Sequence, residues 1–380
     1  MGELMGHEWT VHNTDGKRRV VVTKELPGTR WLDILIAADC AVEVCESPDV
    51  LTNDEIIEHF GDRCDGAIGQ LTENWNADLF AKLAAAGGTA YSNYAVGYNN
   101  VDVAGATAAG IPVGNTPGVL TETTAEMAVA LTFSAGRRVV EADNFMRAGK
   151  FEGWLPTMYM GARFFGATVG VIGCGRIGAA YARMMAEGFK MNVVYYDLYR
   201  NERLEQYISD YSGLLVAHGE APITCRQLNN VEDVLREADV VSLHTVLDET
   251  TTHLINAERL ALMKDDAILI NSSRGPVIDE VALVAHCRTH PDFKAGLDVV
   301  EDEPAMKPGL TDLHNVVVVP HIASATVWTR QGMATLAAAN VAGILQGYPL
   351  WDSDDVVPLL SGDLPEVTPS IVNAQELGLT

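Results

Sequence analysis

The chain has 380 residues, enough for roughly two domains at about 150 residues each. Its 51 Asp and Glu residues against 26 Lys and Arg residues give a formal net charge of −25, which argues against a nucleic-acid-binding protein and against adhesion to anionic membranes. Apolar residues make up 48% of the chain and charged residues 20%, values that exclude a disordered chain, and no apolar run reaches the ~18 residues that a transmembrane helix requires.

Short apolar runs alternate with helical stretches over the first 118 residues. The runs predict strands at 20–23, 42–45, 66–69 and 111–114, and the stretches between them predict helices at 33–37, 53–60, 77–86 and 101–109. Thr52 and Glu55 have the spacing of a capping box, and Gly87 and Gly110 stand where helices end. This alternation predicts a parallel sheet with helices on both faces.

A long helical stretch follows, from about Thr123 to Ala148. Thr123 and Glu126 again have capping-box spacing. About 26 helical residues would span nearly 40 Å, so this helix is expected to connect two domains. The alternative is an ordinary core helix.

A second alternating series runs from 168 to 321. Strands are predicted at 169–172, 193–196, 240–243, 267–270, 296–299 and 316–319, and helices at 176–187, 231–238, 257–263 and 280–288. Six strands in a doubly wound order are typical of a dinucleotide-binding fold. A last long helix is expected over 325–345, before a tail that contains proline.

A G-x-G-x-x-G motif follows the first strand of this second series and opens a helix. Gly173 suits a tight turn, Gly175 lets the backbone approach a pyrophosphate, and Gly178 allows close helix packing. Asp197 follows Gly178 by 19 residues, at the end of the next strand, where an acidic residue binds the ribose hydroxyls. The pattern predicts a dinucleotide site, and the alternative is a glycine-rich turn without a ligand.

The choice of nucleotide depends on the residues around Asp197. Its carboxylate accepts hydrogen bonds from a ribose 2′-hydroxyl and repels a 2′-phosphate, which favours NAD. Arg200 and Arg203 lie just beyond it and would suit the 2′-phosphate of NADP. We therefore expect NADH to be preferred, with NADPH as the weaker alternative.

Three polar residues follow strands of the second series, namely Arg274, Glu303 and His321. The carboxyl ends of the strands line the ligand crevice in doubly wound sheets, so these side chains are expected to face the nicotinamide. A guanidinium suits a carboxylate or a reacting carbonyl. A histidine beside a carboxylate is favoured in its protonated form and can donate a proton to a ketone oxygen. We predict that these three residues are catalytic.

With these motifs the sequence resembles the D-isomer-specific 2-hydroxyacid dehydrogenases. The matching segments are 173–178, 271–279, 298–304 and 320–324, and the resemblance covers nearly the whole chain. Within that family the chain is most similar to the plant and algal NADH-dependent hydroxypyruvate reductases (glycerate dehydrogenases), through residues 27–31, 94–102, 114–126 and 189–192.

The resemblance implies a role for further residues. Backbone N–H groups of Val96 and Gly97 would hold the substrate carboxylate, with Arg274, His321 and Ser324 also at the substrate. Trp154 matches a tryptophan that a neighbouring subunit lends to the substrate pocket, although packing at a dimer interface would explain it equally well. The residues that match cofactor contacts are Gly173, Gly175, Arg176, Ile177, Gly178, Asp197, Thr245, Ser272, Asp298 and Thr124. No metal is expected.

The resemblance also implies an architecture. It consists of two doubly wound parallel-sheet α/β domains, with a Rossmann NAD-binding domain inserted into a discontinuous flavodoxin-like substrate domain. The expected boundaries are 1–118 and 325–380 for the substrate domain and 119–324 for the NAD-binding domain. A homodimer is expected, since two-fold symmetry is the commonest in oligomers.

The expected reaction is NADH-dependent reduction of hydroxypyruvate to D-glycerate, with glyoxylate as a second substrate and a place in photorespiration. One alternative is another member of the family, such as a glyoxylate reductase. A different class of alternative is a nucleotide-sensing interaction protein, since transcriptional corepressors with this fold keep the same Arg, Glu and His residues.

The six cysteines form no C-x-x-C pair and are expected to be free thiols of a soluble protein in a reducing compartment. Residues 1–15 lack the features of a secretory signal or a transit peptide, and the chain stops at Gly378-Leu379-Thr380 without a peroxisomal tripeptide. The resemblance nevertheless suggests a peroxisome or mitochondrion of a photosynthetic eukaryote.

Overall fold

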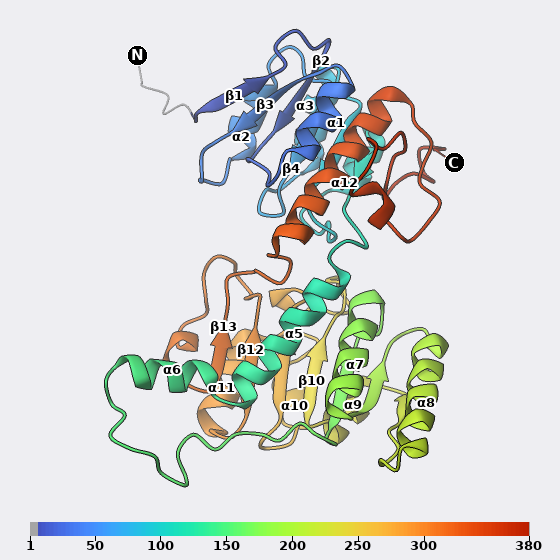
Figure 1. The fold of residues 1–380 in the computed structure, drawn as a ribbon. Helices are drawn as coiled ribbons and strands as arrows, with labels where there is room; N and C mark the ends of the chain where they lie inside the picture. Colours follow the sequence, from blue (N-terminus) through green and yellow to red (C-terminus); the bar gives the residue numbers. More distant parts are fainter. Residues whose placement is uncertain (1–6, 380) are drawn as a thin grey trace. The chain divides into compact units, whose positions relative to one another are not determined.

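The computed structural model describes residues 7–379, which form two compact units (Figure 1). The outer unit contains the described residues up to Leu120 together with those from Ala325 onwards. The inserted unit is Thr121–Ser324. The chain thus leaves the outer unit once, completes the inserted unit and returns.

The outer unit is built on a six-stranded sheet. Its strands are β1 (Trp9–His12), β2 (Arg18–Val22), β3 (Cys40–Cys45), β4 (Gly66–Gly69), β5 (Ala90–Asn93) and β6 (Val113–Gly114). Their order is β1-β3-β2-β4-β5-β6, and only the edge strand β1 is antiparallel to its neighbour. The five parallel strands therefore have the flavodoxin-like order 2-1-3-4-5 that the resemblance implied.

Within the described residues, five helices cover this sheet. They are α1 (Arg30–Ala37), α2 (Asn53–Phe60), α3 (Ala77–Ala85), α4 (Val103–Ala108) and α12 (Val327–Gln346). The predicted capping box is confirmed at α2, where the Glu55 N–H donates to Thr52 Oγ1 at 3.3 Å and the Thr52 N–H donates to Glu55 Oε2 at 2.7 Å. Helix α12 packs on α1, β4 and β5, and small side chains over most of its length let it lie close to the sheet (Figure 1).

The inserted unit has a seven-stranded, wholly parallel sheet. Its strands are β7 (Thr168–Ile172), β8 (Asn192–Tyr196), β9 (Cys225–Gln227), β10 (Val240–Leu243), β11 (Ile268–Asn271), β12 (Lys294–Leu297) and β13 (Val316–Val318). Their order is β13-β12-β11-β10-β7-β8-β9, so chain direction across the sheet reverses between β7 and β10. This is the Rossmann order 3-2-1-4-5-6 with one more edge strand. The doubly wound fold predicted from the sequence is confirmed, but the prediction of six strands missed β9.

Helices cover both faces of the second sheet. They are α5 (Thr121–Gly136), α6 (Val139–Arg147), α7 (Arg176–Phe189), α8 (Glu202–Ala217), α9 (Val231–Glu237), α10 (Ala257–Leu260) and α11 (Glu280–Thr289), with short 3-10 turns at Gly275–Val277 and Leu310–Asp312. One core forms under α5, α7 and α8, and another under α9, α10 and α11.

The single long helix predicted over 123–148 is wrong. Helix α5 ends at Gly136, and Arg138 has a left-handed backbone (φ 56°) before α6 begins. The Gly136 carbonyl accepts the Ala162 N–H at 2.8 Å, and the Arg138 guanidinium pairs with Glu141 and lies over the Tyr159 ring. Contacts with residues 159–162, which follow α6 in the sequence, thus accompany the end of helix α5. Thr123 and Glu126 both lie inside α5, which begins at Thr121.

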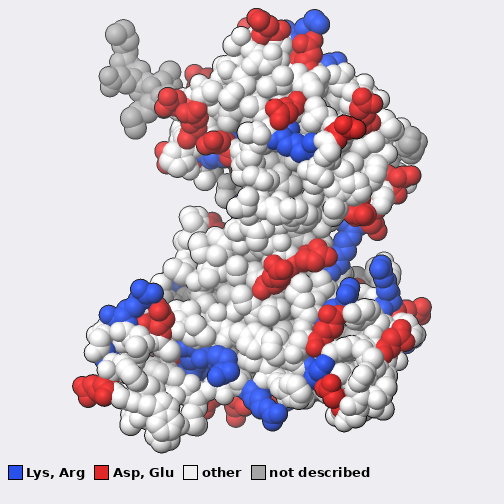
Figure 2. All heavy atoms as spheres, in the orientation of Figure 1, with Lys and Arg blue, Asp and Glu red and all other residues white. Residues whose placement is uncertain are grey.

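No helix among residues 7–379 combines the length and the apolar character needed to span a bilayer. On the face drawn in Figure 2, Lys and Arg side chains lie scattered among Asp and Glu side chains on both units instead of gathering in one stripe.

Candidate functional site

The glycine motif forms the turn between β7 and α7. Gly173 has a φ of 88°, and a Cβ there would lie 2.7 Å from the His244 carbonyl. A Cβ on Gly178 would lie 2.1 Å from the Gly173 oxygen. Backbone packing therefore requires both glycines, as the motif predicted.

Gly175 differs from the other two, because a Cβ there would meet no atom within 4 Å. Gly175 is the N-cap of α7 and supplies no side-chain hydrogen bond to the helix. The space beside Gly175 is thus open at the positive end of the α7 dipole, where a helix N-terminus can bind a pyrophosphate. Arg176 and Ile177 occupy this first turn, with Arg176 exposed.

Asp197 lies directly after β8 and contacts the glycine turn. Its Oδ2 accepts the Cys174 N–H at 2.7 Å, and its Oδ1 accepts the Tyr199 N–H at 3.1 Å. Arg200, one of the two alternative phosphate ligands, forms two-point contacts with Glu205, the shortest at 2.7 Å. An arginine held by a carboxylate is less available to a 2′-phosphate, so this contact favours NAD. The other alternative ligand, Arg203, is exposed in the first turn of α8.

Two buried hydroxyls at the carboxyl edge of the sheet have no hydrogen-bond partner in the described chain. They are Thr245 Oγ1, after β10, and Ser272 Oγ, after β11. Buried hydroxyls are nearly always hydrogen-bonded, so these two point to a ligand that completes them. Both were predicted as cofactor contacts, and Thr124 is buried on α5. The residues present therefore fit a dinucleotide.

Asp298 follows β12 and is 1% exposed. Its Oδ1 accepts the Ile322 N–H at 2.7 Å and its Oδ2 accepts the Ala323 N–H at 3.0 Å, while its carbonyl accepts the His321 N–H at 2.8 Å. Burial raises the pKa of Asp298, against the opposing effect of the two N–H groups. The contacts show that Asp298 fixes the segment that carries His321, which sequence reasoning did not predict.

His321 and Glu303 form a hydrogen-bonded pair, with His321 Nδ1 3.0 Å from Glu303 Oε2. His321 has a left-handed backbone (φ 52°), a conformation that Asp298 helps to hold. Burial opposes ionisation of Glu303, but the hydrogen bond and charge of His321 outweigh it, so the pKa of Glu303 is lowered. The pair leaves Nε2 of the imidazole for a reacting oxygen.

Arg274 completes this group at the end of β11. Burial lowers the pKa of its guanidinium, and the nearby Glu303 carboxylate acts in the opposite direction. An arginine stays charged under such conditions. Its Nη1 donates to the Ser273 carbonyl at 2.7 Å, which orients the planar group. The structure thus brings Arg274, Glu303 and His321 together, as the sequence predicted.

The other predicted substrate residues are distributed over both units. Val96 and Gly97 belong to the outer unit, in a loop whose carbonyls accept hydrogen bonds from Asn115 (2.9 Å) and Asn93 (3.0 Å). Ser324 is the half-buried last residue of the inserted unit. Trp154 is 77% exposed, on the segment between α6 and β7. Over residues 7–379 no three His, Cys, Asp or Glu side chains are arranged to hold a metal ion.

Comparison with known proteins places this geometry in a family. Residues 129–323 match the model "D-isomer specific 2-hydroxyacid dehydrogenase, NAD binding domain". The chain is 60% identical over 372 residues to the glycerate dehydrogenase of Cucumis sativus and 59% identical over 373 residues to the peroxisomal glycerate dehydrogenase of Arabidopsis thaliana, covering 97% of each chain in both cases.

More distant relatives agree with this assignment. The chain is 42% identical to a glyoxylate reductase of Korarchaeum cryptofilum, with 87% of this chain and 94% of that protein covered. The crystal structure of the TT0316 protein from Thermus thermophilus has a TM-score of 0.75 at 37% identity, with 87% of this chain and 97% of that chain covered. With the Rossmann order, the glycine turn and the Arg–Glu–His group, these matches show that the chain belongs to the D-isomer-specific 2-hydroxyacid dehydrogenases.

Proposed function

We propose that this chain reduces hydroxypyruvate to D-glycerate, and glyoxylate to glycolate, with NADH. The observation that carries the proposal is the His321–Glu303 pair beside Arg274, at the edge of a sheet whose glycine turn fits a dinucleotide. The two plant relatives named glycerate dehydrogenase support hydroxypyruvate as the substrate.

Each residue of the group has a distinct role in this proposal. The nicotinamide, when bound, supplies the hydride. His321 donates a proton from Nε2 to the ketone oxygen, while Nδ1 stays on Glu303 and keeps the ring oriented. Glu303 stabilises the protonated imidazole before transfer. Arg274 offers its fork of N–H groups to the substrate carboxylate or carbonyl, and Val96, Gly97 and Ser324 complete substrate binding.

The direct test compares hydroxypyruvate, glyoxylate and pyruvate side by side, each with NADH and with NADPH. We expect the highest kcat/KM for hydroxypyruvate with NADH. A clear preference for glyoxylate would instead favour the alternative of a glyoxylate reductase, the name that the Korarchaeum relative carries. Tight NADH binding without turnover of any 2-oxo acid would favour a nucleotide sensor.

The preference for NADH is expected to depend on the charge of Asp197. Asp197→Asn keeps an oxygen for the Cys174 N–H and removes the repulsion of a 2′-phosphate. A like-charge contact near a protein surface costs a few kcal/mol, so the ratio of kcat/KM for NADPH to that for NADH should rise roughly tenfold or more. Asp210→Asn on the exposed side of α8 is the control, and an unchanged ratio in Asp197→Asn would contradict the assignment.

We further propose a homodimer, because exposed apolar side chains gather on α6 and the segment after it. They are Val139, Val140, Met146, Phe151, Trp154, Leu155, Met160 and Phe165. Many exposed apolar side chains within one segment are typical of an interface.

Two variants separate the interface role of this surface from the expected contact of Trp154 with the substrate of a neighbouring subunit. Trp154→Ala is expected to raise the KM for hydroxypyruvate about tenfold, the effect of losing part of an aromatic contact, without changing the dimer mass. Met160→Glu, at a residue 68% exposed on the same segment, is expected to shift the mass towards the monomer. Mass by light scattering and steady-state kinetics are the measurements. If the Trp154→Ala variant became monomeric while its KM for hydroxypyruvate stayed unchanged, Trp154 would act only in interface packing.

A place in photorespiration, in a peroxisome or mitochondrion of a photosynthetic eukaryote, is our proposal for the cellular setting. The Arabidopsis relative is named peroxisomal, and all six cysteines are free thiols. Expression of the chain as a fluorescent fusion in an algal cell tests this, and diffuse signal outside both organelles would count against it.

A further inference from the structure

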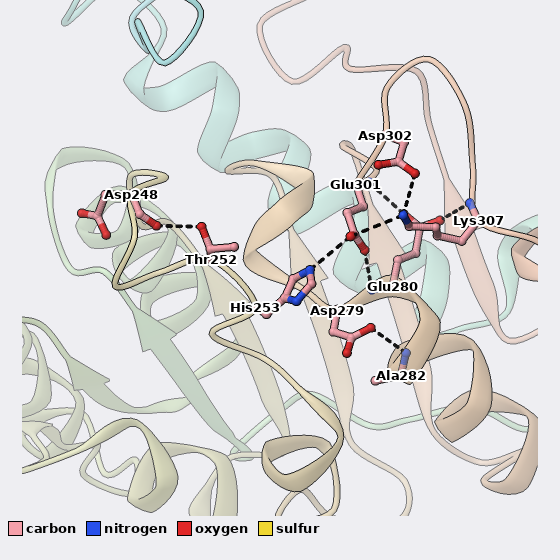
Figure 3. A network of polar contacts seen from close by, with 9 residues as sticks. All are labelled: Asp248, Thr252, His253, Asp279, Glu280, Ala282, Glu301, Asp302 and Lys307. Atoms are coloured by element: carbon pink, nitrogen blue, oxygen red, sulfur yellow. Dashed lines mark hydrogen bonds and ion pairs between the residues drawn. The ribbon is translucent and has the colours of Figure 1, made fainter.

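A buried carboxylate outside the Arg–Glu–His group holds the loop that carries Glu303. Glu280 is the first residue of α11 and is only 2% exposed. Its Oε2 accepts the Glu301 N–H at 2.8 Å and its Oε1 accepts the Lys307 N–H at 2.7 Å (Figure 3). One side chain therefore fixes the loop two residues before Glu303 and four residues after it.

Glu301 returns this contact. Its Oε2 accepts the Glu280 N–H at 3.0 Å, so each glutamate carboxylate accepts the backbone N–H of the other. Its Oε1 lies 3.1 Å from His253 Nε2 and 3.5 Å from Lys307 Nζ (Figure 3). Two nearby carboxylates would repel each other, but Lys307 and the N-terminal end of α11 supply compensating positive charge.

The same contacts reach the loop that carries Arg274. A Cβ on Gly275 would lie 1.8 Å from the Val300 oxygen and 2.6 Å from the Glu301 nitrogen, so the two loop backbones pack directly on each other. The His253 N–H donates to the Pro276 carbonyl at 2.8 Å. The loops after β10, β11 and β12 therefore meet around the two glutamates.

We propose that Glu280 is a positioning residue, whose ionised carboxylate holds the 300–307 loop so that Glu303 stays against His321. The ionised form matters because both of its oxygens accept an N–H. An amide at this position offers one acceptor, and its NH2 group would face the second backbone N–H. The loop would then loosen around Glu303, whose own Oε1 contact with the Val300 N–H is long at 3.3 Å. The kinetic consequence rests on the proposed function.

The test is Glu280→Gln in the full chain, with Asp279→Asn as the matched control. Asp279 is the neighbouring carboxylate, and it caps α11 through the Ala282 N–H at 2.9 Å, a contact that asparagine can keep (Figure 3). For Glu280→Gln we expect kcat with hydroxypyruvate to fall at least about tenfold and NADH affinity to stay within about twofold. Asp279→Asn should match the original chain in both.

A second readout does not depend on turnover. The Nδ1–H proton of His321, identified by its loss in His321→Ala, should resonate at low field in the original chain and in Asp279→Asn. It should broaden or move upfield in Glu280→Gln. An unchanged proton signal overturns the proposal, and so does a loss of kcat with NADH binding lost in parallel.

Failure of the proposed function and failure of the variant to fold can each be distinguished from failure of the role proposed for Glu280. If the original chain reduces no 2-oxo acid, the proposed function fails, and the proton signal alone decides the role of Glu280. If Glu280→Gln does not yield folded protein, Glu301→Gln is judged by the same measurements, since it keeps one acceptor and weakens the contacts to His253 and Lys307.

Discussion

His321→Ala is expected to lower kcat for hydroxypyruvate by about 10²–10⁴-fold, the range over which a positioned general acid contributes. The imidazole is the proton donor of the proposed reaction, and its Nδ1 lies 3.0 Å from Glu303 Oε2. NADH affinity should change little, because the glycine turn, Asp197 and the two buried hydroxyls remain. Steady-state absorbance of NADH gives kcat, and fluorescence titration gives the affinity.

The control for this variant is His314→Ala. His314 is an exposed histidine in the connection between β12 and β13 that also carries Glu303, so its loss should leave kcat within about twofold. Retention of kcat in His321→Ala would show that the proton comes from another group and would remove the central argument for this site.

The state of Glu303 sets the pH range in which the pair exists. Its pKa is lowered in the folded chain, because the contact with His321 outweighs the burial that opposes ionisation. A lowered pKa means that the carboxylate contributes stability above its ordinary pKa and loses that contribution only as the pH falls through the lowered value. The pair is therefore intact at neutral pH.

The Rossmann part of the fold could be predicted because its central strands are continuous apolar runs. Strands such as β7 and β10 are fully or nearly fully buried between helices on both faces, which is what a run of Val, Ile and Leu indicates. The position of Arg274, Glu303 and His321 followed from the same logic, since the loops that follow parallel strands meet at one edge of the sheet.

Other elements carried weaker signals. Strand β5 was missed because its buried residues Ser92 and Asn93 are polar, with hydrogen bonds to Asn340 and Asn100 that only the folded chain reveals. Strand β1 has no apolar run and pairs antiparallel at the sheet edge. Helix α8 was missed although a signal existed, because Asn201 caps it and its buried residues Leu204, Ile208 and Leu215 recur at helical spacing.

The residues that position the site could not be predicted in the same way. Glu280 and Asp298 act by accepting N–H groups from residues 21 to 27 positions away. A carboxylate at the start of a helix, or after a strand, is ordinary in sequence. Only the three-dimensional arrangement shows which backbone it holds.

Arg274→Lys is expected to lower kcat/KM for hydroxypyruvate by about 10²–10³-fold, comparable to the loss of one preorganised donor at a developing oxyanion. Lysine keeps the positive charge beside Glu303 but loses the planar fork. In the structure Nη1 is already committed to the Ser273 carbonyl at 2.7 Å, which directs the rest of the guanidinium. A single ammonium group cannot keep that contact and also make two parallel bonds to a substrate carboxylate or carbonyl.

The matched control is Arg288→Lys, at an exposed arginine whose one ion-pair partner among the described residues is Asp312, at 3.9 Å. Its kcat/KM should stay within about twofold, and NADH affinity should be unchanged in both variants. The pH profile of Arg274→Lys should also keep its shape, because the charge that acts on Glu303 is retained. If Arg274→Lys retained most of its kcat/KM, Arg274 would act as a charge alone, and substrate orientation would have to come from other residues.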